Sequence, residues 1–460
     1  MVNGQFEFWR ESLNKPKSLQ LSQLGSETRT KLVKRHISLT FVYKTLAIGL
    51  SFLLVPLTIN YLNIEQYGIW MTLLSVMSWV AFFDIGLGNG LRNKLADAVA
   101  VNDIKLAKTY VSTAYIAIGF IALLLFVVLL ATIPVVDWNK IFNTSSVSNS
   151  ELLKLVVSVS FFFLFNFVLS LCKQMFYAYQ EASLATLGQV FLNLIALSLI
   201  YILIRYTAGR LLYLGICYGM AMVLSNLALM YCFFKKHKEL IPSINCVELS
   251  RIREIGSLGV KFFIIQIAVL VIFATDNMII TQILGPAEVT PYNVVFKLFS
   301  VIAIGHGIIV TPLWSAYTEA YAKGDVKWIR NTLKKLNMLM IPIIIAVVIL
   351  IVFAKDIITI WVGPEIKFSY SLVVLMGVYV TISVWSNVYA YFVNGIGKIK
   401  PQMYSAILSG IINIPLSVYF AKYLNMGISG VILGTIVSLS LFAIIGPIQS
   451  YYLLNKMANI

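Results

Sequence analysis

The chain has 460 residues, of which 59% are hydrophobic and only 12% are charged, and its formal net charge is +16. Soluble globular proteins carry about a quarter charged residues, so this composition excludes an ordinary soluble domain and indicates a polytopic helical membrane protein. The positive charge is concentrated in the segments between apolar stretches, as in membrane proteins, and does not indicate a nucleic-acid partner.

Residues 1–38 are polar and basic and contain no apolar stretch of the kind found in a signal peptide, so we expect a cytoplasmic tail. Twelve apolar segments follow, each long enough to cross a bilayer as a helix. They cover residues 39–62, 66–91, 109–133, 152–177, 184–204, 211–233, 258–283, 291–318, 336–354, 372–394, 402–423 and 428–454. The sequence therefore predicts an all-α membrane protein.

A polar segment, residues 234–257, divides the apolar spans into two sets of six. We expect an N-terminal lobe over residues 39–233, a cytoplasmic linker over 234–257 and a C-terminal lobe over 258–454, followed by a cytoplasmic end at 455–460. The connections between spans are short, which leaves no room for an external catalytic domain. The four cysteines show neither CxxC nor metal-ligand spacing, so the sequence predicts no disulfide, metal site or bound cofactor.

The distribution of basic residues predicts the orientation in the membrane. If the N-terminus is cytoplasmic, 24 of the 35 Lys and Arg residues fall in cytoplasmic segments and only five in external ones. Membrane proteins carry such an excess on their cytoplasmic loops. Both termini are therefore predicted to lie in the cytoplasm.

An internal repeat relates the two predicted lobes. The segment AVNDIKLAK (100–108) matches AKGDVKWIR (322–330), and Asn193 matches Asn413 at nearly the same offset. Both lobes would begin at the cytoplasmic face, which makes them parallel repeats about an axis along the membrane normal. Transporters built in this way bind substrate between the repeats and expose it alternately to each side.

Asp276 and Lys297 are the most specific pair of charged residues within the predicted spans. Both lie about 10–14 Å below the predicted external surface, on neighbouring antiparallel spans. Charged side chains inside a membrane usually serve a partner, a cavity or a function. The pair is either a structural ion pair, or Lys297 faces a cavity while Asp276 tunes it or binds a coupling ion such as H⁺ or Na⁺.

Lys44, Lys173 and Lys261 lie near the cytoplasmic ends of their predicted spans. Each could extend its ammonium group to the lipid headgroups. Together they could also surround the cytoplasmic mouth of a pathway and attract an anionic group.

The segment FFDIGLGNGLRN (82–93) combines Asp84 with three glycines at the end of the second predicted span. Gly86 and Gly90 have the i, i+4 spacing that lets another helix approach closely. Asp84 would lie two turns inside the membrane, where an acid faces either a cavity or a partner helix. A gating or coupling role is one interpretation of this residue.

These residues carry a resemblance to a known family. The signature of Tyr67, Gly68 and Trp70, the FFDIGLGNGLRN segment and the TIWVGPEI stretch (359–366) are similar to those of Wzx-type polysaccharide flippases. That family belongs to the multidrug/oligosaccharidyl-lipid/polysaccharide (MATE-like) exporter superfamily. The resemblance extends over essentially the whole chain.

The resemblance implies a bacterial inner-membrane flippase rather than an enzyme. Its fold would be two six-helix lobes in a V, and its cargo an undecaprenyl-pyrophosphate-linked oligosaccharide such as an O-antigen or capsule unit. Lys44 and Lys297 would be the counterparts of the basic cavity residues of the family, with lysine where relatives often have arginine. Its partners would be membrane lipids, a polysaccharide polymerase and a chain-length regulator.

Two other functions fit parts of the pattern. A cation-coupled multidrug antiporter of the same superfamily would use acids in the N-terminal lobe, where Asp84 is the only well-embedded acid. A membrane-embedded polysaccharide polymerase or glycosyltransferase would need a large external loop or a catalytic pair of acids, and the sequence shows neither.

Overall fold

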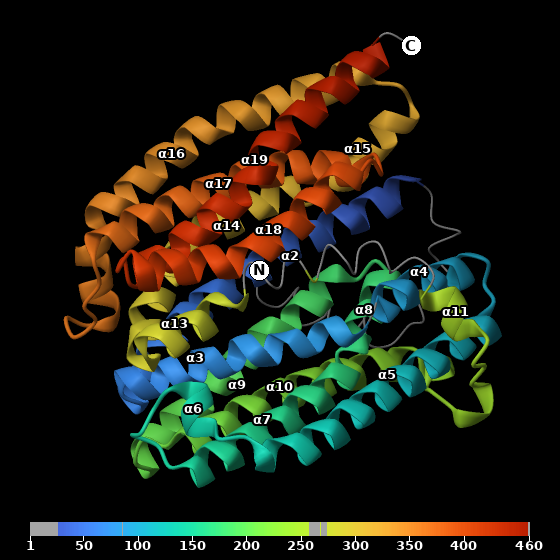
Figure 1. Ribbon diagram of the computed structural model, residues 1–460. Coiled ribbons are helices and arrows are strands. Elements are labelled where there is room, and N and C mark those ends of the chain that lie inside the picture. The colour runs from blue at the N-terminus through green and yellow to red at the C-terminus, as the bar shows by residue number, and fades with distance from the viewer. Residues whose placement is uncertain (1–25, 85, 257–266, 268–273, 459–460) are drawn as a thin grey trace, which may run out of the picture. The chain divides into compact units, whose positions relative to one another are not determined.

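The computed structural model (Figure 1) describes residues 26–84, 86–256, 267 and 274–458, and the regular elements among them are all helical. The chain forms two compact units. The N-terminal unit comprises Met1–Tyr61, Met77–Trp138 and Val147–Phe263, and the C-terminal unit comprises Leu62–Val76, Asn139–Ser146 and Ile264–Ile460. Two short segments from the first half of the chain thus belong to the C-terminal unit.

The helices of the N-terminal unit follow the order of the chain. They are α2 (Ser26–Tyr61), η2 (Trp79–Asp84), α4 (Leu87–Ala100), α5 (Ile104–Thr132), η3 (Ile133–Val135), α7 (Asn149–Leu169), α8 (Leu171–Ala178), α9 (Ala182–Tyr206), α10 (Leu211–Lys236), η4 (Lys238–Leu240), η5 (Ile244–Cys246) and α11 (Arg251–Gly256). Helix α10 packs against α7 and α9, α2 packs against α9, and α5 packs against α4 and α7 (Figure 1).

The C-terminal unit contains the helices that follow α11 together with two from the first half of the chain. They are α3 (Ile64–Ser78), α6 (Trp138–Phe142), α13 (Asp276–Leu284), η6 (Pro286–Glu288), α14 (Val289–Val310), α15 (Leu313–Ala322), α16 (Val326–Val362), α17 (Tyr370–Gly395), α18 (Lys400–Val418), the π-helical turn η7 (Tyr419–Tyr423) and α19 (Ile428–Ala458), with the ends of α3 and α6 reaching into the other unit. Helix α17 packs against α14, α16 and α19, and α18 packs against α19 (Figure 1).

Each unit has its own apolar core. In the N-terminal unit, Leu91 and Leu95 on α4 are fully buried together with Phe233 on α10. Their i, i+4 spacing places both leucines on one face of α4. In the C-terminal unit, Tyr317 and Phe392 stack edge to face within a second core cluster.

Ten helices within the described residues are long and apolar enough to cross a membrane. They are Ser38–Tyr61, Ile104–Val135, Asn149–Ala178, Ala182–Tyr206, Leu211–Lys236, Pro286–Val310, Val326–Val362, Tyr370–Gly395, Lys400–Tyr423 and Ile428–Met457. They confirm ten of the predicted spans and the all-α membrane class. Most of the predicted seventh span, residues 258–283, lies outside the described residues, and only its end is seen as α13.

The prediction that residues 66–91 form one continuous span was wrong. Helix α3 ends at Ser78, the tighter helix η2 continues to Asp84, and α4 begins at Leu87 after Gly86, whose φ is +81°. A positive φ is available to glycine at little cost and interrupts a right-handed helix. Hydropathy measures apolar content and does not detect such a break.

The predicted linker, residues 234–257, is folded against the N-terminal unit. The hydroxyl of Tyr110 on α5 donates to Glu254 over 2.9 Å, and Arg251 pairs with Glu254 at 2.7 Å. Ser243 N–H donates to Ser112 Oγ, also on α5. Much of this segment is therefore a structured layer on α5 and α4 rather than an extended tether.

The repeat anchors occupy equivalent positions in the two units. Asp103 accepts a hydrogen bond from Leu106 N–H at the start of α5, and Asp325 accepts one from Trp328 N–H at the start of α16, each over 2.9 Å. Each aspartate satisfies one of the unpaired N–H groups at a helix N-terminus. The repeated N-D/G-D pattern is therefore a pair of matching helix caps.

Candidate functional site

A buried carboxylate in the C-terminal unit is the centre of the most unusual polar cluster in the described structure. Asp276 opens α13 and is only 4% exposed. The hydroxyl of Tyr292, on α14, donates to its Oδ2 over 2.5 Å, and the hydroxyl of Thr435, on α19, lies 3.2 Å from both carboxylate oxygens. The consecutive helices α13 and α14 thus meet the distant helix α19 at one acid.

The short contact to Tyr292 is a charge-assisted hydrogen bond when the acid is ionised. The position of Asp276 in the first turn of α13 also suits a negative charge, because the helix dipole is positive at that end. No cation contacts Asp276 among the described residues, since its partners are the two hydroxyls. The site therefore holds the acid by hydrogen bonds without neutralising its charge.

A fourth helix extends the cluster behind Thr435. Asn413, on α18, is fully buried and donates its Nδ2 to Thr435 Oγ1 over 3.2 Å. Its Oδ1 is buried without a hydrogen-bond partner among the described residues. Buried polar atoms normally have a hydrogen-bond partner. This oxygen is therefore a candidate to accept a hydrogen bond from a bound proton donor or to coordinate a small hard cation.

Aromatic rings cover one side of the acid. Tyr292 stacks on Phe296 with ring centroids 6.4 Å apart, and Phe296 contacts Tyr379 on α17 at 6.0 Å. Burial among rings makes an uncompensated charge costly, because the charge loses its hydration. The surroundings thus favour binding of a proton or a cation by the carboxylate.

A ladder of amides and hydroxyls lies beside the acid. Asn293 donates to Asn277 Oδ1 over 2.8 Å, and Asn277 donates to Ser75 Oγ over 2.6 Å. The hydroxyls of Thr72 and Thr281 are 2.6 Å apart. These bonds fasten α3 to α13 and α14, so the position of Asp276 is rigidly defined.

The predicted site residues are distributed over both units. Lys297 lies half-buried on α14, five residues after Tyr292, so Tyr292 and Thr435 rather than Lys297 contact Asp276 within the described residues. Lys44 on α2 and Lys173 on α8 lie half-buried in the N-terminal unit. Lys261 lies outside the described residues.

Asp84 has a local structural role in the N-terminal unit. Its Oδ2 accepts a hydrogen bond from Gly88 N–H, over 3.1 Å, in the first turn of α4. An acid at this position satisfies an unpaired N–H and interacts favourably with the helix dipole. The bond explains why an acid stands at the break in the second predicted span, and a coupling role for Asp84 stays a prediction.

Gly90 supplies the close approach predicted from the glycine spacing. A Cβ on Gly90 would lie 1.8 Å from the backbone oxygen of Ile255 on α11. Gly86 instead has the left-handed backbone at the start of α4. The two glycines therefore serve different purposes, and the close neighbour of Gly90 is helix α11.

Sequence reasoning missed both partners of Asp276, Tyr292 and Thr435. Asn413, which contacts Thr435, stood out only as an anchor of the internal repeat, and its polar contact was not predicted. Thr435 gave no signal, because one threonine in an apolar helix is unremarkable and its partner lies 159 residues away.

Comparison with protein families agrees with the resemblance seen in the motifs. The profile described as "Polysaccharide biosynthesis protein" matches residues 33–317, and the MatE profile matches residues 262–419. A Yersinia pseudotuberculosis protein named for O-antigen export is 22% identical over 86% of this chain and 90% of its own length. A Salmonella typhimurium protein named for O-antigen transport is 25% identical over 87% and 92%.

Solved structures show the same fold. An inward-facing multidrug resistance MATE family transporter of the MOP superfamily aligns with a TM-score of 0.74 and 15% identity, covering 91% of this chain and 99% of that one. An outward-facing structure of such a transporter aligns with a TM-score of 0.64 and 16% identity, over 96% and 99%. The all-α polytopic fold predicted from the sequence is confirmed. Since the polysaccharide profile matches more than half of the sequence, the chain belongs to the polysaccharide biosynthesis protein family.

Proposed function

We propose that this protein is a flippase that moves an undecaprenyl-pyrophosphate-linked oligosaccharide, such as an O-antigen or capsule unit, across the bacterial cytoplasmic membrane. The observation that carries the proposal is the family match over residues 33–317, supported by full-length relatives named for O-antigen export and transport. The ten membrane helices and the MATE-like fold are those of a transporter, not an enzyme. Alternating access is the mechanism that suits a repeated fold of this kind.

The orientation in the membrane is part of the proposal. The excess of Lys and Arg in the segments assigned to the cytoplasm supports cytoplasmic N- and C-termini. In this orientation Asp276 lies toward the periplasmic half of the membrane. A polysaccharide polymerase and a chain-length regulator would receive the cargo on that side.

The cargo carries a pyrophosphate, and lysines within the spans are the groups that would attract it. Lys44, Lys173 and Lys297 are half-buried in membrane helices, and Lys261 belongs to the predicted seventh span. A lysine offers a compact charge but not the two parallel hydrogen bonds that arginine gives to a phosphate. We therefore expect attraction and orientation of the pyrophosphate rather than a rigid clamp.

Asp276 is the group proposed to couple transport to an ion gradient. Its hydroxyl partners and the unpartnered Asn413 Oδ1 together offer a set of oxygens suited to H⁺ or Na⁺. Exchange of the ion would change the charge of a carboxylate that ties α13, α14 and α19 together. Binding of the ion would thus favour one packing of these helices over another.

A cation-coupled multidrug antiporter is the second candidate. It is favoured by the MatE profile over residues 262–419 and by the likeness to solved MATE transporters. The relatives at 22% and 25% identity that cover most of the chain are named for O-antigen export and transport, which favours the flippase.

The test is complementation of a strain that lacks its own polysaccharide flippase, with surface polysaccharide as the readout. The native chain restores export, Lys297→Ala abolishes it and Lys297→Arg retains it, because the positive charge is what attracts the pyrophosphate. Lys422→Ala, at the end of the predicted eleventh span, is the matched control. Full export by the Lys297→Ala variant would remove Lys297 from the mechanism, and drug resistance without export would favour the antiporter.

A further inference from the structure

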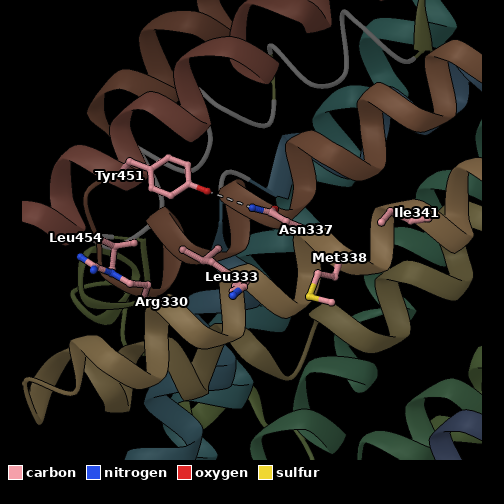
Figure 2. Close-up of a pocket in the computed structure, with 8 residues that line it drawn as sticks. Arg330, Leu333, Asn337, Met338, Ile341, Tyr451 and Leu454 are labelled. Atoms are coloured by element: carbon pink, nitrogen blue, oxygen red, sulfur yellow. Dashed lines mark hydrogen bonds between the residues drawn. The ribbon is translucent and has the colours of Figure 1, made fainter.

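A groove of about 390 Å³ lies between α16 and α19 of the C-terminal unit, and Asp276 is not among the residues that line it (Figure 2). Its lining combines basic, polar and apolar side chains, with Arg330 at one end and the apolar Met338 and Ile341 at the other (Figure 2). It comprises Arg330, Leu333, Lys334, Asn337, Met338, Ile341, Tyr451 and Leu454. The proposed transport function uses none of these residues.

The basic end of the groove suits an anion. Arg330 and Lys334 are exposed and stand one turn apart on α16, on the same face of the helix. Arg330 uses one donor on Asn455 Oδ1, over 3.4 Å, and a guanidinium has five. Among the described residues that line the groove, none is acidic. The two positive charges are therefore not neutralised within it.

Tyr451 adds an oriented hydroxyl to this end. Tyr389 donates to Asn337 Oδ1 over 3.1 Å. Asn337 in turn donates its Nδ2 to the Tyr451 oxygen over 3.3 Å, the bond drawn in Figure 2. Because the Tyr451 oxygen accepts this bond, its own proton can be donated to an incoming oxygen. The groove thus offers a guanidinium, an ammonium and a hydroxyl to one ligand.

The apolar end continues along the length of α16. Met338, Ile341, Ile345, Val348 and Val352 are each more than half exposed. Their spacing of three and four residues places them in one row along the helix. From Met338 to Val352 the row extends about 21 Å. This is longer than the hydrocarbon part of one bilayer leaflet, about 15 Å, so the row can accommodate a whole acyl chain.

The position of the groove along α16 matches the lipid headgroups. No charged residue occurs between Lys335 and Lys355, so this stretch occupies the hydrocarbon core and Arg330 and Lys334 lie just outside it. Tyrosines such as Tyr451 and Tyr452, which are 50% and 66% exposed, are enriched at that level of membrane proteins.

We propose that this groove binds an anionic phospholipid of the cytoplasmic leaflet. The phosphodiester contacts Arg330, Lys334 and the Tyr451 hydroxyl, and an acyl chain follows the apolar row that begins at Met338 and Ile341. Charge complementarity and the continuous exposed row point to a two-part amphipathic ligand. The bound molecule is a resident membrane lipid that fixes α16 against α19, and the proposal does not depend on the identity of the transported cargo.

The test is lipid binding by the purified full-length protein in neutral detergent. Phosphatidylglycerol is titrated against phosphatidylcholine, with bound lipid counted by native mass spectrometry and protection measured by thermal unfolding. We expect the wild type to prefer phosphatidylglycerol. In the double variant Arg330→Gln/Lys334→Gln, the affinity should fall about 30-fold, since each basic group at an anionic headgroup contributes about fivefold. Tyr451→Phe should weaken binding a few-fold.

The matched control is Lys335→Gln/Lys456→Gln, which removes the same charge from exposed positions of the same two helices outside the groove. This control should keep the preference for phosphatidylglycerol. Equal losses in both double variants would overturn the proposal in favour of general surface charge, as would a wild type with no preference between the two lipids. Stronger competition by undecaprenyl pyrophosphate than by phosphatidylglycerol would also overturn it, because the groove would then be a cargo site. Counting bound lipid on intact protein keeps the comparison valid if a variant is less stable.

Discussion

Replacing Asp276 separates its structural contribution from its proposed role in coupling. In Asp276→Asn, the amide oxygen can accept from Tyr292 and the amide nitrogen can donate to Thr435, whose own proton can go to Val431 O, 3.4 Å away. The network is kept, so we expect a loss of less than about 1.5 kcal/mol. In Asp276→Ala, two buried hydroxyls lose the carboxylate as acceptor at about 1–3 kcal/mol each, so the total cost is about 2–6 kcal/mol.

The assay pairs thermal unfolding of the purified variants with export in the complemented strain. If Asp276 exchanges an ion during transport, Asp276→Asn folds almost normally but does not export. Ser75→Ala is the control, because Ser75 contacts Asn277 in the adjacent ladder and not Asp276. Export by Asp276→Asn at the wild-type rate, with the same dependence on proton or sodium gradients, would refute the coupling role. Equal stability of the alanine and asparagine variants would refute the energetic reasoning.

Three further predictions concern the architecture. Gly90→Ala should destabilise the N-terminal unit by about 3 kcal/mol in thermal unfolding, because its Cβ would collide with Ile255 O, whereas Asn89→Ala, at an exposed position, should have little effect. Asp103→Ala and Asp325→Ala should each lower the free energy of unfolding by about 1 kcal/mol, because each removes a helix cap. Asparagine at either position should retain the cap and the stability, and an equal loss with asparagine would contradict the capping role. His237 is buried against Tyr179 and Phe233, and this burial, with Lys236 beside it, lowers its pKa to about 4. In the unfolded chain this histidine binds a proton below about pH 6.5, whereas in the native state it does so only below about pH 4. Between these two values the free energy of unfolding therefore falls as the pH falls, by up to about 3 kcal/mol. The melting temperature of His237→Phe should change less between pH 7.5 and 5 than that of the wild type, and identical pH profiles would exclude this titration.

Hydropathy and charge identified the membrane class and ten spans, because those properties depend on local composition. The limits of the spans were less exact: the predicted span 336–354 is the helix Val326–Val362, and the predicted span 291–318 includes the break between α14 and α15. The break in residues 66–91 was not predictable in this way. It results from the backbone conformation of Gly86 and from the hydrogen bond between Asp84 and Gly88 N–H. Hydropathy averaged over about 20 residues detects neither feature.

The candidate site was predictable only in part. Asp276 could be identified because an acid in an apolar span is costly and therefore has a reason to be there. Its partners could not be identified, because pairing with Thr435 depends on how α19 packs against α13. The sequence left two alternatives open: an ion pair with Lys297, or a cavity faced by Lys297 in which Asp276 tunes the lysine or binds a coupling ion. Neither specified a carboxylate held by hydroxyl groups.

The neutral character of its partners determines what Asp276 can do. A carboxylate paired with a lysine is compensated by that charge, and removing either partner leaves the other buried and uncompensated. Held by Tyr292 and Thr435 instead, the acid keeps its hydrogen bonds whether it binds a proton or a small cation, or neither, since each hydroxyl can both donate and accept. The surrounding hydrogen bonds can then be kept when the carboxylate binds or releases an ion. In the proposed coupling role, such an acid would gain and lose an ion in each transport cycle without unfolding the helices around it.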